Sequence, residues 1–236
     1  MDASEYALVY GVRRTRGALK EWNDRPWPVL KEWVIGSVAA ATLLLTAVWL
    51  VAGITSDSAI VSIRRPPLTT GDPTDVTRIL GHNALVLALH AMACIAGFIA
   101  GSSLPMQAPY QNGLSKALHE KGGRLAILFV IGATAFSLTG QAVVLGLSVA
   151  HVASALHTGP GLLLLGLLPH ALPELTALFL PLAAWIIASR RGDWDKLLAA
   201  TVVTVAIAVP ILIMTALWEV YVAPHVLHAL IAYPTP

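Results

Sequence analysis

Apolar and polar stretches alternate along this chain in a pattern typical of helices that cross a membrane. Five apolar runs, each long enough for a hydrocarbon core of ~30 Å, are separated by polar segments. They predict spans at about residues 34–54, 79–101, 125–147, 162–188 and 197–222. The expected fold class is therefore all-α, a polytopic membrane helix bundle of about five transmembrane helices.

The polar segments divide the chain into three parts. Residues 1–33 mix apolar side chains with Arg13, Arg14, Arg16 and Lys20, which fits either a short amphipathic helix on a membrane surface or a solvated basic leader. If residues 1–33 contain such a helix, Pro26 and Pro28 are expected to end it. Residues 34–223 form the predicted transmembrane domain, and residues 224–236 form an outer tail. Loops are expected at residues 55–78, 102–124 and 148–161.

The basic residues give the orientation, because Lys and Arg gather in cytoplasmic loops. If five spans are assumed, twelve of the fifteen Lys and Arg residues fall on the side of the N-terminus. The other three are Arg64, Arg65 and Arg78. We therefore expect the N-terminus in the cytoplasm and the C-terminus outside.

Composition supports a membrane protein and excludes several other classes. The chain is 56% hydrophobic and 12% charged, whereas a soluble domain has roughly 25% charged residues. A net charge of +2 does not favour binding to nucleic acid. Cys94 is the single cysteine, so disulfides and cysteine metal sites within one chain are excluded. No cofactor is expected, and the first partner expected is the lipid bilayer.

The fourth apolar run contains the first functional candidates, His170 and Glu174. On a helix these residues lie on one face, and ionisable groups at membrane depth are expected to face protein or a water-filled cavity. The run has 27 residues, or ~40 Å of straight helix, which is longer than the membrane core. Because proline is disfavoured inside a helix, we expect this helix to be broken near Pro169 and Pro173.

Such a break would raise His170 and Glu174 to the depth of other polar residues. Glu219 lies near the outer end of the fifth span, and His225 follows it closely. His82 and Asn83 lie at the outer start of the second span. A straight fourth helix would instead leave Glu174 roughly 10 Å or more below Glu219. The broken helix therefore predicts a polar cluster of His82, Asn83, His170, Glu174, Glu219 and His225.

Four interpretations of this cluster stay open at the level of sequence. Its members could pair with each other and with freed backbone groups and only fix helix packing. The carboxylates could serve transport or a proton relay. The cluster could bind a partner at the outer mouth, or it could hold zinc in an enzyme. The chain contains no HExxH motif and no nucleotide fingerprint, so no catalytic residue and no metal ligand is assigned.

Three segments together resemble one family. They are ILGHNALVL at residues 79–87, LLPHALPEL at residues 167–175 and WEVYVAP at residues 218–224. In this order they are similar to the stage II sporulation protein M (SpoIIM) family of integral membrane proteins. Asn83, His170, Glu174 and Glu219 match motif positions of that family. The chain departs from it at Ala171, where the family usually has glycine, and at His82, where asparagine is common.

The resemblance implies a bacterial multi-pass inner-membrane protein. The family's namesake anchors peptidoglycan-degrading partners during engulfment in spore formers, whereas many relatives occur in bacteria that make no spores. We therefore expect a non-enzymatic scaffold for membrane or cell-envelope partners. The alternative is a transporter or ion-coupled component that uses Glu174 and Glu219. Homo-oligomerisation is left open, because a five-helix bundle is small and has faces that contain glycine.

Overall fold

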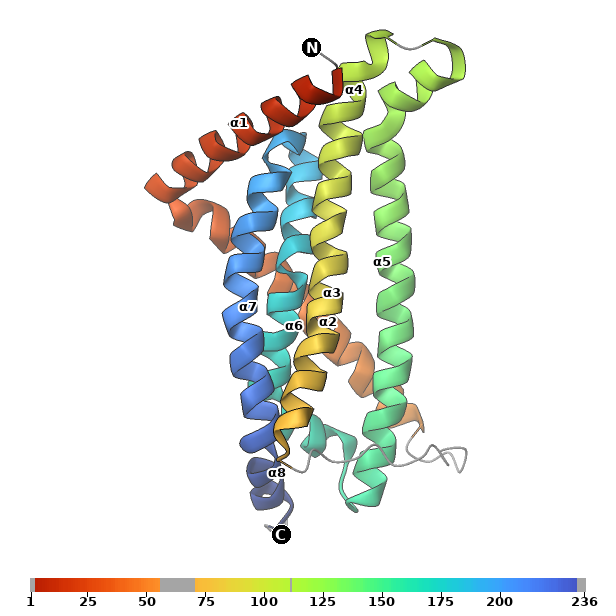
Figure 1. Ribbon diagram of the computed structural model, residues 1–236. Coiled ribbons are helices and arrows are strands. Elements are labelled where there is room, and N and C mark those ends of the chain that lie inside the picture. The colour runs from red at the N-terminus through yellow and green to blue at the C-terminus, as the bar shows by residue number, and fades with distance from the viewer. Residues whose placement is uncertain (1–2, 56–70, 111, 233–236) are drawn as a thin grey trace. The chain divides into compact units, whose positions relative to one another are not determined.

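The computed structural model describes residues 3–55, 71–110 and 112–232, and these residues are helical with short turns (Figure 1). In chain order the elements are α1 (Ala3–Asp24), α2 (Pro26–Thr55), α3 (Pro73–Phe98), a π-helical turn η1 (Ile99–Ser103), α4 (Leu104–Gln107), a 3₁₀ turn η2 (Ala108–Tyr110), α5 (Gly113–Ala155), α6 (Pro160–Arg191), a 3₁₀ turn η3 (Trp194–Lys196), α7 (Leu197–Tyr221) and α8 (Ala223–Ala232).

Five helical segments of the described chain are long and apolar enough to cross a membrane. They are Pro26–Thr55, Pro73–Ser102, Lys121–Ala155, Pro160–Arg191 and Trp194–Tyr221. The predicted all-α fold with five candidate spans is thus confirmed. The helices are longer than the apolar runs, since residues 73–78 and 113–124, which were expected in loops, are helical. Most of the expected outer tail is also helical and forms α8.

Proline and cap residues explain several helix ends. Pro26, Pro73 and Pro160 begin α2, α3 and α6, where the missing N–H costs nothing because first-turn donors have no helical partner. The Asp72 side chain caps α3 by accepting a hydrogen bond from the Thr74 N–H at 2.8 Å. Since α1 ends at Asp24, the first helix stops where the prolines predict.

The turn between α5 and α6 is a Schellman motif built on an unusual residue. The Thr158 N–H donates to the Ala153 carbonyl and the His157 N–H donates to the Ser154 carbonyl. His157 takes the left-handed position with φ of 51°, where glycine is the usual residue. At the end of α6, Gly192 fills the equivalent position with φ of 76°, and the Asp193 N–H donates to the Ala188 carbonyl.

The chain divides into two compact units. The first comprises Met1–Ser37, Leu85–Thr134 and Leu178–Ala208, and the second comprises Val38–Ala84, Ala135–Ala177 and Val209–Pro236. Each unit is described by itself.

The first unit is built around large aromatic side chains. One buried cluster contains Trp33, Leu180, Ala184 and Ala200, and a second contains Cys94, Phe98, Trp185 and Leu197. The Trp22 ring meets the Trp33 ring edge to face, with 5.2 Å between ring centroids.

Two glycines in this unit make room for tryptophan rings. A Cβ atom on Gly97 would lie 2.5 Å from Trp185 Nε1, and one on Gly101 would lie 2.1 Å from the Trp194 ring. Gly97 and Gly101 form the GxxxG motif of the second apolar run. In this structure the two glycines of the motif pack against the indole rings of Trp185 and Trp194. Gly101 belongs to the π-helical turn η1.

Side chains of α3 contact the backbone of α6 beside a proline in its interior. His90 Nδ1 lies 2.8 Å from the Leu178 carbonyl oxygen, and the Cys94 thiol donates to the Pro181 carbonyl at 3.2 Å. Because Pro181 has no N–H, the Ala177 carbonyl four residues earlier has no regular helical donor. The two side chains of α3 contact backbone carbonyls close to this gap.

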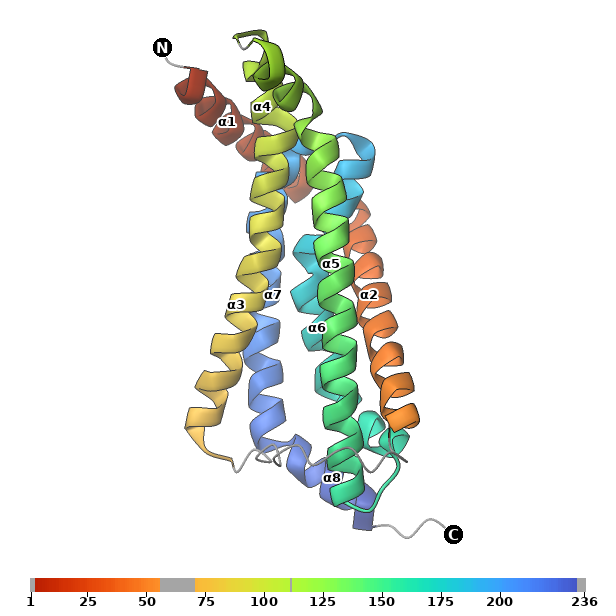
Figure 2. The ribbon, with the colours of Figure 1, turned by 90° about the vertical axis from the view of Figure 1, so that its right-hand side faces the viewer.

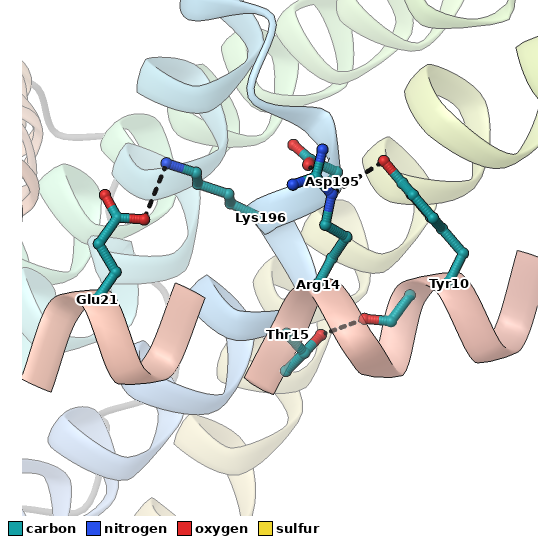
Figure 3. A network of polar contacts seen from close by, with 7 residues as sticks. Tyr10, Arg14, Thr15, Glu21, Asp195 and Lys196 are labelled. Carbon is teal, nitrogen blue, oxygen red and sulfur yellow. Dashed lines mark hydrogen bonds and ion pairs between the residues drawn. The ribbon is translucent and has the colours of Figure 1, made fainter. Parts of the chain in front are cut away.

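Ion pairs join α1 and the start of α2 to the turn between α6 and α7. The Arg14 guanidinium lies 3.0 Å from the Asp195 carboxylate, and Lys196 Nζ lies 3.6 Å from the Glu21 carboxylate. Figure 3 shows the residues of both pairs. Arg191 pairs with Glu32 at 2.8 Å. The hydrogen bond that Arg14 Nε donates to the Tyr10 hydroxyl, together with the neighbouring Asp195 charge, raises the pKa of Arg14 above its ordinary value.

In the second unit, helices pack closely where one of them has a glycine, and α6 is bent. Gly146 of α5 packs against Val51 of α2, and Gly166 of α6 packs against Leu227 of α8. The first turns of α6 bend away from the direction of the turns that follow and lie beside α8 (Figure 1 and Figure 2).

The predicted break of the fourth helix at Pro169 is wrong. α6 is one helix from Pro160 to Arg191, and it passes through Pro169 and Pro173 without ending. Each proline removes a single N–H donor, so the remaining helical hydrogen bonds keep the segment continuous while it bends.

Candidate functional site

The second unit contains a cluster of polar side chains from three helices. Asn83 comes from α3, His170 and Glu174 come from successive turns of α6, and Thr215 and Glu219 come from successive turns of α7. Asn83, His170 and Thr215 are 4%, 5% and 5% exposed. Since α6 and α7 are otherwise strongly apolar, these residues form a localised polar site.

Glu174 is the centre of the cluster. The side chains of Asn83 and Thr215 approach its carboxyl group, and the Glu219 carboxyl is close enough to repel it. Even so, Glu174 Oε2, Asn83 Nδ2 and His170 Nδ1 are buried without a regular hydrogen-bond partner among the described residues. Buried polar atoms are nearly always satisfied in folded proteins. This cluster therefore has unused capacity to bind a proton, a water molecule or a ligand.

A cavity of about 190 Å³ lies beside these polar side chains. His170, Glu174 and Glu219 line it together with apolar residues of α2, α5 and α6, among them Leu44, Val48, Leu145 and Leu167. A water molecule occupies ≈ 30 Å³ in the liquid. The cavity therefore has room for several waters or one small ligand beside two carboxyl groups.

A second cavity lies on another side of His170. It measures about 360 Å³ and is lined by Pro169 and Pro173 of α6 and by α7 residues that include Pro210, Thr215 and Trp218. Three prolines border this cavity, and each of them lacks the N–H that would donate a regular helical hydrogen bond. His170 thus contributes to the walls of both cavities.

The first turns of α3 extend the polar site towards the surface. Arg78 attracts the Glu219 carboxylate, and Asp75 repels it. Arg78 and Asp75 are themselves ion-paired at 2.6 Å, and the Arg78 side chain is exposed. Polar groups therefore continue from the half-buried Glu174 through Glu219 to a charged pair at the surface of this unit.

The structure brings together four of the six residues predicted for the cluster. Asn83, His170, Glu174 and Glu219 meet, although the helix break that was expected to unite them is absent. His82 is exposed on α3 and His225 is exposed on α8. His225 Nδ1 lies 3.0 Å from the Tyr221 carbonyl of the preceding turn, so it does not join the site.

Three members of the site were not predicted. Thr215 is one helical turn before Glu219, and this i, i+4 spacing could have identified it. Arg78 and Asp75 lie about one and two helical turns before His82 and Asn83, but the sequence pattern predicts a loop over residues 55–78. Recognising Asp72-Pro73 as a helix start would have placed both on α3.

The described residues contain no group of three or more His, Cys, Asp and Glu side chains that could hold a metal ion. Comparisons of this chain with protein-family models, with curated proteins and with solved structures gave no match.

Proposed function

We propose that this chain is a multi-pass protein of a bacterial inner membrane, related to the stage II sporulation protein M family, that assembles cell-envelope partners without being an enzyme. The observation that carries the proposal is the meeting of Asn83, His170, Glu174 and Glu219. These residues carry the family resemblance, and they come from three different helices, α3, α6 and α7. A chance match of short apolar motifs gives no reason for its polar residues to share one buried site.

The exposure of α5 supports an assembly role. Only 6% of its most apolar 18-residue window is buried, against 50% for α6. Phe129 and Phe136 are strongly exposed, and the space in front of Gly132 and Gly140 is open. Small residues let a neighbouring helix approach closely in a membrane. A partner helix would find on α5 both apolar contact area and room for close packing.

Site-specific photo-crosslinking in the native membrane tests the assembly role. A photoreactive residue at Phe136 of α5, which is 83% exposed, is compared with one at Leu43 of α2, which is 68% exposed. We expect Phe136 to give a discrete adduct that mass spectrometry assigns to an envelope protein, while Leu43 gives only lipid adducts. Lipid adducts alone at both positions would contradict the proposal.

A second candidate function, an ion-coupled membrane component, is favoured by a separate observation. Glu174 and Glu219 face one cavity, and polar groups lead from it to Arg78 and Asp75. Two adjoining carboxyl groups in an apolar site are best stabilised by a shared proton or a bound cation. Such a pair is suited to taking up and releasing a cation as its access changes.

One substitution separates the two functions. Glu174→Gln removes the titratable group at the centre of the site and keeps its size. If the protein is an assembly factor, the photoreactive residue at position 136 is expected to give the same adduct in this variant. The purified protein in vesicles is then expected to show no cation-dependent flux, with or without the substitution. An ion-coupled component is expected to lose proton or sodium flux in the same variant while the adduct persists.

A further inference from the structure

An apolar groove lies in the first unit where α1 meets α2. It measures about 310 Å³ and is lined by Leu19, Trp22, Asn23, Pro26, Val29, Leu30, Trp33 and, from α7, Val203. We call this space the elbow groove. Asn23 is its one polar lining residue, so its walls offer dispersion contacts and little hydrogen bonding.

The position of the groove relates it to a membrane boundary. α2 is a candidate span that begins at Pro26, whereas α1 is not apolar enough to be one. The groove is formed by the last turns of α1 and the first turns of α2, so it lies at one end of a candidate span. Trp27, beside it in sequence, is strongly exposed, and tryptophan is enriched at the level of lipid headgroups.

The charges around the groove favour an anionic ligand. Of the acids on these turns, Glu21 pairs with Lys196 and Glu32 pairs with Arg191. Arg16, Lys20 and Arg25 are exposed and form no ion pair with any described residue. Asp24 is the one unpaired acid among residues 16–33. Lys20 follows the lining residue Leu19, and Arg25 precedes the lining residue Pro26.

We propose that the elbow groove binds an acyl chain of an anionic phospholipid, with Lys20 and Arg25 holding its headgroup phosphate. The elbow groove has lining residues whose sequence neighbours are unpaired cations, and it lies at the end of a candidate span, so it matches both parts of such a lipid. Bound in this way, the lipid fixes the angle between α1 and α2. The ion pairs of Figure 3 hold the same helix against the turn between α6 and α7.

Native mass spectrometry of the full chain, purified in detergent and stripped of lipid, tests the proposal. Phosphatidylglycerol and phosphatidylcholine with identical chains are titrated separately. We expect the first phosphatidylglycerol to bind roughly tenfold more tightly, because its headgroup has a net negative charge that attracts basic residues, whereas the choline cation cancels the phosphate charge of phosphatidylcholine. Soluble glycerol 3-phosphate is expected not to compete, since it has no chain to fill the groove. Equal affinity for the two lipids, or full competition by glycerol 3-phosphate, would overturn the proposal.

Variants locate the site. Lys20→Glu combined with Arg25→Glu should abolish the preference for phosphatidylglycerol, and Val203→Phe should weaken binding of both lipids by filling the groove. Lys121→Glu is the matched control, because Lys121 is an exposed cation on α5. An equal loss of preference in Lys121→Glu would show non-specific attraction and overturn the assignment. The comparison of the two lipids on the unaltered chain decides the proposal if a variant fails to fold.

Discussion

The carboxyl groups of Glu174 on α6 and Glu219 on α7 face one cavity and repel each other. Asn83 and Thr215 approach Glu174 with neutral polar groups. A further negative charge near Glu174 is therefore expected to lower the stability of the folded protein, because an uncompensated charge in an apolar environment is costly.

Asn83→Asp is expected to destabilise the protein by adding a third carboxylate to this site. Asn83 is buried, so the new charge cannot be solvated, and we expect a loss of roughly 2–3 kcal/mol. His82→Asp is the control, since His82 is adjacent but exposed, and a change within about 0.5 kcal/mol is expected. Thermal unfolding midpoints in detergent measure both variants. Equal midpoints would show that the site tolerates another charge.

The sequence predicts the number of candidate spanning helices correctly but underestimates their length. Hydrophobicity reports where a helix is apolar, and it gives no signal for the solvent-exposed turns that extend it. Residues 73–78 include the charged residues Asp75 and Arg78 and still form the start of α3. The backbone hydrogen bonds of a helix form whether its side chains are polar or apolar. Pro169 likewise suggested an end to the fourth helix, and the helix bends instead.

The candidate site could be predicted in part, for a geometric reason. His170 and Glu174 share a helix face by their spacing, so their common location follows from the sequence. His82 and Asn83 are adjacent and therefore point about 100° apart on a helix. Only one of them can face Glu174, and the sequence does not indicate which. His225 lies beyond the end of α7 on a separate helix, whose direction depends on the turn at Val222.

Gly101→Ala is expected to destabilise the first unit, because its Cβ would overlap the Trp194 ring. A fused ring cannot yield like the end of a flexible side chain, so the expected loss is about 1–3 kcal/mol. Gly132→Ala, which meets nothing within 4 Å, should instead stabilise its helix by up to about 1 kcal/mol. Chemical unfolding measures both. A Gly101→Ala, Trp194→Ala double variant should cost less than the sum of its parts, and simple additivity would argue against the overlap.

His157→Gly is expected to stabilise the protein. His157 is exposed and holds a left-handed conformation at the end of α5. Glycine adopts this conformation without the strain of a Cβ atom, which costs other residues about 1 kcal/mol. The control is His225→Gly, at an exposed position within α8, where glycine should destabilise by a similar amount. Unfolding midpoints that fall in both variants would contradict the role assigned to His157.

Asp72 is expected to make the start of α3 sensitive to acid. The Thr74 backbone N–H that donates to its carboxylate lowers the pKa of Asp72 below its ordinary value. A lowered folded-state pKa stabilises the cap above about pH 4, the value for an unfolded Asp, and this stabilisation is lost as pH falls through the folded-state pKa. Hydrogen exchange over residues 74–77, corrected for intrinsic rates, should show protection falling as the pH drops below about 4. Asp72→Asn keeps a cap that does not titrate. A parallel fall in this variant would assign the acid effect to other groups.

The orientation of the chain is open to a direct test with cysteine labels. In a Cys94→Ser background, Ser4→Cys precedes the five candidate spans and Ala232→Cys follows them. An odd number of crossings places these positions on opposite sides. A membrane-impermeant thiol reagent applied to intact cells should therefore label position 232 and leave position 4 unlabelled until the membrane is opened, because the basic residues near α1 favour the cytoplasm. Labelling of position 4 alone would reverse the orientation. Equal labelling of both positions would mean that one of the five helices does not cross.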